Sequence, residues 1–184
     1  CGPVGLFATA IAKASGASLI AAADLNSYRL NLAKSMGAHE VFTVATVKSN
    51  HNLVRWMKSI SGGEGFDVIL EMSGSASAIT TAFQAARTGG RITLFGIPST
   101  SVNIDVAETM IFKNLTVVAV NGREIFASWY KTKSLLETGA VNLDRLITHE
   151  VGLQNISQAF ELLESGNAGK IIVLPQNASG LTQR

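Results

Sequence analysis

Short apolar runs alternate with amphipathic segments along most of this 184-residue chain. The runs occupy residues 18–23, 66–72, 91–96, 115–120 and 170–174. Because they are apolar at both odd and even positions, they predict strands that are buried on both faces. Such strands require a parallel sheet covered by helices on each side, and right-handed crossovers then produce a doubly wound α/β fold.

Helical patterns fill the intervals between these runs. The expected helices cover residues 2–16, 26–37, 51–61, 75–88, 108–114, 124–139 and 156–166, and a further brief strand covers 40–42. Glycine ends several of these helices, as is common where a helix must turn into a loop.

Composition excludes several classes of protein. Apolar residues make up 47% of the chain and charged residues 15%, which indicates a folded domain with a sizeable core. The net charge of +2 is spread without a basic block, so we expect no nucleic-acid partner. Lys13 interrupts the apolar start, so we expect no membrane anchor. With Cys1 as the only cysteine, no internal disulfide can form, which favours a reducing, cytoplasmic location.

The chain opens with a glycine turn that leads directly into a helix. Gly2 and Gly5, with Pro3 and Val4 between them, match the last two glycines of the dinucleotide fingerprint G-x-G-x-x-G. Gly2 would let the backbone approach a pyrophosphate, and Gly5 would let the helix pack closely on the sheet. The amides at the start of the helix would face the phosphates.

An acidic residue follows at the distance that this fingerprint requires. Asp24 closes the second apolar run nineteen residues after Gly5, where a carboxylate can accept hydrogen bonds from the adenosine ribose. It would repel a 2′-phosphate, so NAD is favoured over NADP, and we place Arg29 over the adenine ribose. Two alternatives stay open. Asp24 could simply cap the next helix, or the turn could belong to a methyltransferase-type fold that binds S-adenosylmethionine.

The first glycine of the fingerprint would lie one residue before Cys1. We therefore expect a Rossmann fold in which the first, central strand is lacking from the 184 residues. In the sheet order 3-2-1-4-5-6 that strand joins the two halves. Without it the two halves have no shared neighbour, so we expect either that the strand belongs to the molecule but lies outside these 184 residues, or that another segment fills the gap.

The stretches "GPVGLFATAIAKASGA", "AADLNSYRLNLAKSMGA", "GFDVILEMSGSASAI" and "NGREIFASWYK" resemble the zinc-dependent medium-chain alcohol dehydrogenases. The similarity runs from residue 1 to about 174 and is greatest to the members that oxidise L-threonine. It implies a cofactor domain at 1–143, a segment at 144–174 that returns to the catalytic domain, and a flexible tail at 175–184. It also implies a small-molecule alcohol substrate and a homo-oligomer, either a dimer or a tetramer.

The resemblance also implies individual cofactor contacts. Val4 would pack against NAD with its backbone beside the pyrophosphate, and Asp24 and Arg29 match the ribose and adenosine positions. The remaining contacts would line the nicotinamide end and are Phe95, Gly96, Ile97, Val120 and Asn121. Phe95 and Asn121 stand where threonine-oxidising members typically carry Leu and Tyr. Another alcohol of the polyol or diol type therefore stays open as the substrate, and so does a non-catalytic NAD-sensing module.

No catalytic residue and no metal ligand is expected within the 184 residues. One cysteine and the scattered His39, His51 and His149 cannot build a catalytic zinc site, so zinc is expected in the parent enzyme only. We expect His149 to be structural and Glu71 to orient backbone. The chain alone is expected to bind NAD weakly and not to catalyse.

Overall fold

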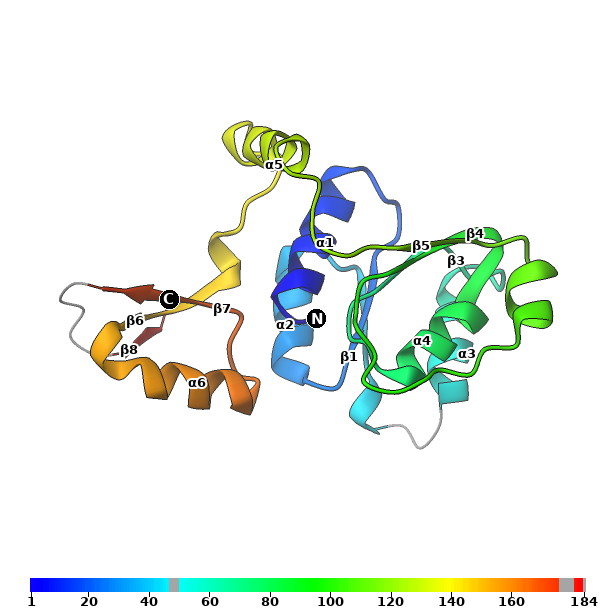
Figure 1. Ribbon diagram of the computed structural model, residues 1–184, viewed down its shortest axis with the longest axis horizontal. Helices are drawn as coiled ribbons and strands as arrows, with labels where there is room; N and C mark the ends of the chain where they lie inside the picture. Colours follow the sequence, from blue (N-terminus) through cyan, green and yellow to red (C-terminus); the bar gives the residue numbers. More distant parts are fainter. Residues whose placement is uncertain (47–49, 176–180, 184) are drawn as a thin grey trace. The chain divides into compact units, whose positions relative to one another are not determined.

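The computed structural model describes residues 1–46, 50–175 and 181–183, which divide into two compact units (Figure 1). One unit comprises Cys1–Ala45 with Tyr130–Arg184, and the other comprises Thr46–Trp129. Each unit has a hydrophobic core of its own. We call them the first and the second unit.

The first unit begins with a helix and a βαβ element. Helix α1 (Pro3–Ala14) is followed by β1 (Ala21–Asp24), α2 (Ser27–Met36) and β2 (Glu40–Thr43). The two strands are parallel, with Ala21 opposite Glu40 and Asp24 opposite Thr43. Helix α2 packs on both strands and on α1. Leu6 and Ala33 are fully buried between these elements, because the apolar stripes of both helices face the same core.

The C-terminal part of the first unit forms another small sheet. It follows α5 (Ala127–Glu137), which crosses the boundary between the units. Its elements are η3 (Asp144–Leu146), β6 (Ile147–Gly152), η4 (Leu153–Asn155), α6 (Ile156–Ser165), β7 (Lys170–Leu174) and β8 (Leu181–Gln183). Strand β6 is central, parallel to β7 and antiparallel to β8. A flexible tail was expected over 175–184, but residues 181–183 form β8 on the free edge of β6; residues 176–180 and 184 lie outside the described residues.

The second unit is a three-stranded parallel sheet with helices. Its elements are α3 (Asn50–Ile60), β3 (Phe66–Glu71), α4 (Ala76–Ala85), β4 (Ala86–Leu94), the π-helical turn η2 (Ala107–Ile111) and β5 (Thr116–Ala119). The strand order is β3-β4-β5. Helix α4 lies against β3 and β4, and α3 lies against α4 (Figure 1). Phe83 and Ile92 form the centre of this core.

These observations confirm the predicted α/β class with parallel sheets. Strands β1 and β2 form one sheet and β3, β4 and β5 another, as expected for the two halves of a 3-2-1-4-5-6 order. Within the described residues, no strand pairs with both β1 and β3. The two halves therefore have no shared neighbouring strand among the described residues, and no described segment fills the gap.

One helix ends earlier than its sequence pattern predicts. The pattern extends to residue 88, yet α4 ends at Ala85 and β4 begins at once with Ala86. A distant ammonium group caps this helix end, since Lys113 Nζ donates to the carbonyl oxygens of Phe83 at 2.8 Å and of Gln84 and Ala86 at 2.9 Å. A lysine in this position satisfies the free carbonyls at a helix end and interacts favourably with the helix dipole.

The substitution Lys113→Met tests whether Lys113 stabilises the C-terminal end of α4. It keeps the aliphatic chain but removes three donors to main-chain carbonyls, so we expect the free energy of unfolding to fall by roughly 1–3 kcal/mol. Chemical denaturation of both proteins measures the change. Lys131→Met, at an exposed position, is the matched control and should leave the unfolding midpoint close to that of the wild type. Equal midpoints for the two variants would contradict the capping role.

Candidate functional site

The glycine turn forms an uncapped helix N-terminus. Gly2 is the N-cap of α1 with extended backbone, and Pro3 takes the first helical position, where its missing N–H costs nothing. The carbonyl oxygen of Gly2 accepts the first helical bond, from Leu6 N at 3.0 Å. No side chain caps this end. The amides of Val4 and Gly5, in the first turn, therefore lack helical acceptors.

Space is open around both glycines. A Cβ atom added to Gly2 or to Gly5 would meet no atom within 4 Å. At Gly2 the described residues therefore leave the backbone open. At Gly5 the open space differs from the close helix–sheet packing that the fingerprint suggested, since no described residue packs against that position.

Asp24 lies beside the glycine turn. It ends β1, and its side chain is only 14% exposed. The Oδ1 atom accepts a hydrogen bond from the amide of Asn26 at 2.8 Å, and Oδ2 forms an ion pair with the terminal ammonium group at Cys1. The structure thus brings together the turn and the acid that lies nineteen residues after Gly5.

Arg29 lies in the first turn of α2. Its amide donates to the Oδ1 of Asn26 at 3.2 Å, so Asn26 is a true N-cap and Asp24 is not. The Nε atom of Arg29 is buried and has no hydrogen-bond partner among the described residues. Buried donors are almost always satisfied, so Arg29 Nε is open to an acceptor from outside the described residues.

The nicotinamide-end residues lie in the second unit, at the carboxyl ends of its strands. Phe95, Gly96 and Ile97 directly follow β4, and Val120 and Asn121 directly follow β5. The amides of Phe95 and Gly96 donate to the carbonyl oxygen of Glu71 at 2.9 and 3.2 Å. Val120 N donates to Leu94 O at 3.0 Å, which continues the ladder between β5 and β4. The ends of these strands are therefore fixed by main-chain bonds.

Glu71 orients backbone, as the sequence analysis expected. Its carboxylate is buried at the end of β3 and accepts the amides of Ser73 at 2.9 Å and Gly74 at 3.2 Å, together with the Ser73 hydroxyl. Three donors on one carboxylate satisfy its charge without solvent. The carboxylate is consequently engaged and not free for proton transfer.

Gly74, after β3, and Gly96, after β4, allow the two loops that follow these strands to come into close contact. A Cβ at Gly96 would lie 2.0 Å from Gly74 N, and one at Gly74, where φ is +69°, would lie 2.5 Å from Ile97 O. Neither position accepts a side chain. Sequence reasoning named Gly96 but missed Gly74, although the motif Glu-Met-Ser-Gly at a strand end was a usable signal.

His149 is a buried structural residue of β6. Gly169 N donates to Thr148 Oγ1 at 3.0 Å, and the same hydroxyl is hydrogen-bonded to His149 Nδ1 at 2.9 Å. The imidazole is thus held inside the sheet by its neighbour in β6. Burial lowers the pKa of His149 below its ordinary value.

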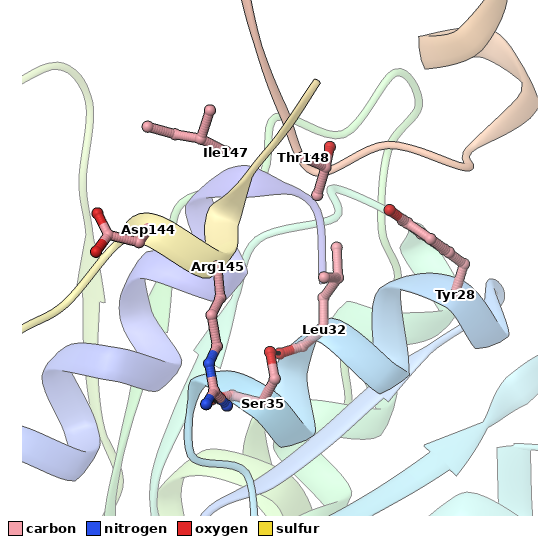
Figure 2. Close-up of a pocket in the computed structure, with 7 residues that line it drawn as sticks. All are labelled: Tyr28, Leu32, Ser35, Asp144, Arg145, Ile147 and Thr148. Carbon is pink, nitrogen blue, oxygen red and sulfur yellow. Dashed lines mark hydrogen bonds between the residues drawn. The ribbon is translucent and has the colours of Figure 1, made fainter. Parts of the chain in front are cut away.

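A shallow hollow of about 470 Å³ lies between α2 and the start of β6 (Figure 2). Tyr28, Leu32 and Ser35 line it from α2, and Asp144, Arg145, Ile147 and Thr148 line the other side. Figure 2 shows Arg145 extending toward Ser35, whose carbonyl oxygen accepts its Nη1 at 3.3 Å. None of the predicted cofactor contacts lines this hollow.

The described residues contain neither a metal-binding cluster nor a membrane-spanning helix. Within residues 1–46, 50–175 and 181–183, no three His, Cys, Asp or Glu side chains cluster in a way that could hold a metal ion. Among the helices in the described part of the chain, none combines the length and apolarity that a membrane span requires.

The parallel strands, the open glycine turn and the acid that ends β1 define a nucleotide-binding α/β domain of the doubly wound class. A family model described as "Zinc-binding dehydrogenase" matches residues 3–138. The chain belongs to this family, and the resemblance inferred from its sequence is confirmed.

Individual relatives agree with this assignment. The L-threonine 3-dehydrogenase of Bacillus velezensis is 41% identical over 95% of this chain and 49% of its own length. The alcohol dehydrogenase of Thermotoga maritima superposes with a TM-score of 0.83 at 30% identity, over 95% of this chain and 48% of that one. The 2R,3R-butanediol dehydrogenase of Bacillus subtilis gives 0.82 at 27%, over 96% and 49%. The chain spans about half the length of the curated relatives it matches.

The buried His149 makes stability depend on pH. In the unfolded chain a histidine takes up a proton near pH 6.5, whereas the folded state resists protonation because its pKa is lowered. The unfolded state therefore binds more protons as the pH falls from 7.5 to 5.5. We expect this group to remove stability by up to about 1.4 kcal/mol per pH unit below 6.5, until the folded pKa is reached.

Denaturation of the wild type and of His149→Gln at several pH values measures this effect. The variant should lose less stability than the wild type over the same interval. His51→Gln, at an exposed position, should keep the wild-type pH slope. A His149→Gln slope equal to that of the wild type would show that the buried imidazole is not responsible.

Proposed function

We propose that this chain is the NAD-binding part of a zinc-dependent dehydrogenase. The parent enzyme oxidises the secondary alcohol of L-threonine to 2-amino-3-ketobutyrate and transfers hydride to NAD. The observation that carries the NAD assignment is the carboxylate of Asp24 held beside an open, uncapped glycine turn. The name of the relatives that match at about 40% identity supports the choice of threonine.

The residues of the first unit fit the adenosine and pyrophosphate part of NAD. The amides of Val4 and Gly5 would bind the pyrophosphate, since they lack helical partners and lie at the positive end of the helix dipole. Asp24 would accept the ribose hydroxyls, and Arg29 has a buried Nε without an acceptor. Gly2, together with Pro3, keeps side-chain atoms out of the approach to the turn.

The residues of the second unit fit the nicotinamide end. Phe95, Ile97 and Val120 are exposed apolar side chains at strand ends, and Ile97 is 85% exposed. Gly96 and Asn121 supply backbone at the same strand ends, as the resemblance implies. When bound, NAD supplies the hydride acceptor; these residues orient its ring and exclude water.

Zinc does not fit the described residues, because no ligand cluster exists among them. We therefore assign the metal to the remainder of the parent enzyme. The domain arrangement, with 1–143 binding the cofactor and 144–174 returning to the catalytic part, belongs to the same proposal.

A diol or polyol is the second candidate substrate. Phe95 and Asn121 depart from the residues typical of threonine-oxidising members, and a butanediol dehydrogenase is among the similar structures. We further propose a cytoplasmic homo-oligomer. Among the described residues β5 pairs only with β4, and an unpaired edge strand suits contact with a second copy.

The substitution Asp24→Asn tests the NAD site. It preserves the shape but removes the charge that would bind the ribose, so the dissociation constant for NAD should rise roughly tenfold or more. Titration calorimetry measures it. Asp67→Asn is the control, because Asp67 is an exposed carboxylate paired with Arg87 at 2.7 Å in the second unit. Equal NAD affinity in Asp24→Asn and wild type, or binding of S-adenosylmethionine in place of NAD, would refute the assignment.

The substrate is tested with the complete polypeptide that contains this chain. NADH formation, followed by absorbance, should have a higher kcat/KM with L-threonine than with sorbitol or 2,3-butanediol. The 184-residue chain alone should produce no NADH with any of them, because it lacks a zinc site among its described residues. A higher value with a diol would replace threonine by the second candidate, and no turnover with any alcohol would favour an NAD-sensing module.

A further inference from the structure

The side chain of Asn26 joins two segments that are far apart in the sequence. Its Nδ2 donates to the carbonyl oxygen of Gly166 at 3.2 Å, across a separation of 140 residues. Gly166 ends α6 and opens the loop 166–169, which leads into β7. One hydrogen bond therefore ties this loop to the N-terminus of α2.

The same residue contacts the Asp24 carboxylate and the backbone of Arg29, the two residues of the proposed ribose site. The amide of Asn26 donates to Asp24 Oδ1 at 2.8 Å, and its Oδ1 accepts the amide of Arg29 at 3.2 Å. Asn26 thus uses its main chain, its side-chain oxygen and its side-chain nitrogen in three different directions. A shift of this residue would move Asp24 and Arg29 together.

The loop 166–169 lies in close contact with Asn26 and with α2. Gly166 has a φ of +76°, and a Cβ there would lie 2.3 Å from Asn26 Nδ2. A Cβ at Gly169 would lie 2.6 Å from Leu146 O and 3.2 Å from Leu32 Cδ1 on α2. Both glycines are buried. A side chain at Gly166 would displace the Asn26 side chain, and one at Gly169 would clash first with the carbonyl of Leu146 and then contact Leu32 of α2.

We propose that Asn26 is a positioning residue for NAD binding, and that the loop 166–169 acts on the ribose site through it. This inference rests on the proposed function, since it assumes that Asp24 and Arg29 bind the adenosine ribose. The loop itself contributes no ligand contact. It limits the movement of Asn26 and thereby the orientation of the Asp24 carboxylate.

Two substitutions from different segments break the same bond. Asn26→Ser keeps a side-chain oxygen that can cap α2 but removes the donor to Gly166. Gly166→Ala places a methyl group against Asn26 Nδ2. Gly16→Ala is the matched control, because Gly16 also has a positive φ, of +81°, yet a Cβ there would meet no atom within 4 Å. Gly166→Ala and Gly16→Ala both place alanine at a positive φ and so share the backbone strain. Only Gly166→Ala brings a methyl group against Asn26.

Titration calorimetry with NAD and with NADP measures the outcome, on proteins checked for folding by thermal unfolding. We expect Asn26→Ser and Gly166→Ala each to weaken NAD binding about fivefold or more, and the double variant to be no worse than either, because both act on one interaction. The preference for NAD over NADP should fall in both, since a misplaced Asp24 repels a 2′-phosphate less. Gly16→Ala should keep the wild-type affinity and preference.

Three results would overturn the inference. NAD affinities of Asn26→Ser and Gly166→Ala equal to that of Gly16→Ala would remove the positioning role, while Asp24→Asn would still report on the proposed function. Equal weakening of NAD and NADP binding would indicate a general structural defect instead of a misplaced carboxylate. No NAD binding by the wild type would refute the proposed function and this inference together. If Gly166→Ala does not fold, Asn26→Ser alone decides.

Discussion

The local structure depends on carboxylates that end parallel strands and accept the amides of the turn that follows. Asp24 ends β1 and accepts the amide of Asn26; Glu71 ends β3 and accepts those of Ser73 and Gly74. A turn at a strand end has amides that no ladder satisfies, and a charged acceptor two residues earlier in the chain supplies the missing partner. Both units thus have the same feature: a carboxylate at the carboxyl end of a parallel strand that accepts the amides of the next turn.

This feature explains why small residues cluster at the strand ends. Glu71 binds the amides of residues 73 and 74, and this loop lies close to the end of β4. There is consequently no space for a Cβ at Gly74 or at Gly96. Around Gly2, by contrast, the space is open and the helix amides are uncapped. The backbone is closely packed where a carboxylate accepts the amides of the turn, and it is open where no side chain caps them.

The sequence predicted those features that depend on residues close together in the chain. The apolar run at 66–72 became β3, the cap and glycine stop around 26–37 became α2, and Asp24 lies beside the turn. The end of α4 depends on Lys113, far along the chain, and β8 depends on a free edge of β6. No periodicity within a short window carries that information, because the partner lies outside the window. The roles of the individual cofactor contacts, and the domain boundary at 143, stay predictions.

Segments on either side of residue 143 are joined by specific bonds. Arg145 donates to Ser35 O near the end of α2, and Asn26 donates to Gly166 O at its start. Both ends of one helix are therefore held by residues from the C-terminal segment. Helix α2 follows the acid that is proposed to bind the ribose, so its placement sets the direction of that carboxylate. A segment without any ligand contact can then influence nucleotide affinity, provided that the helix moves as a rigid body between its two attachments.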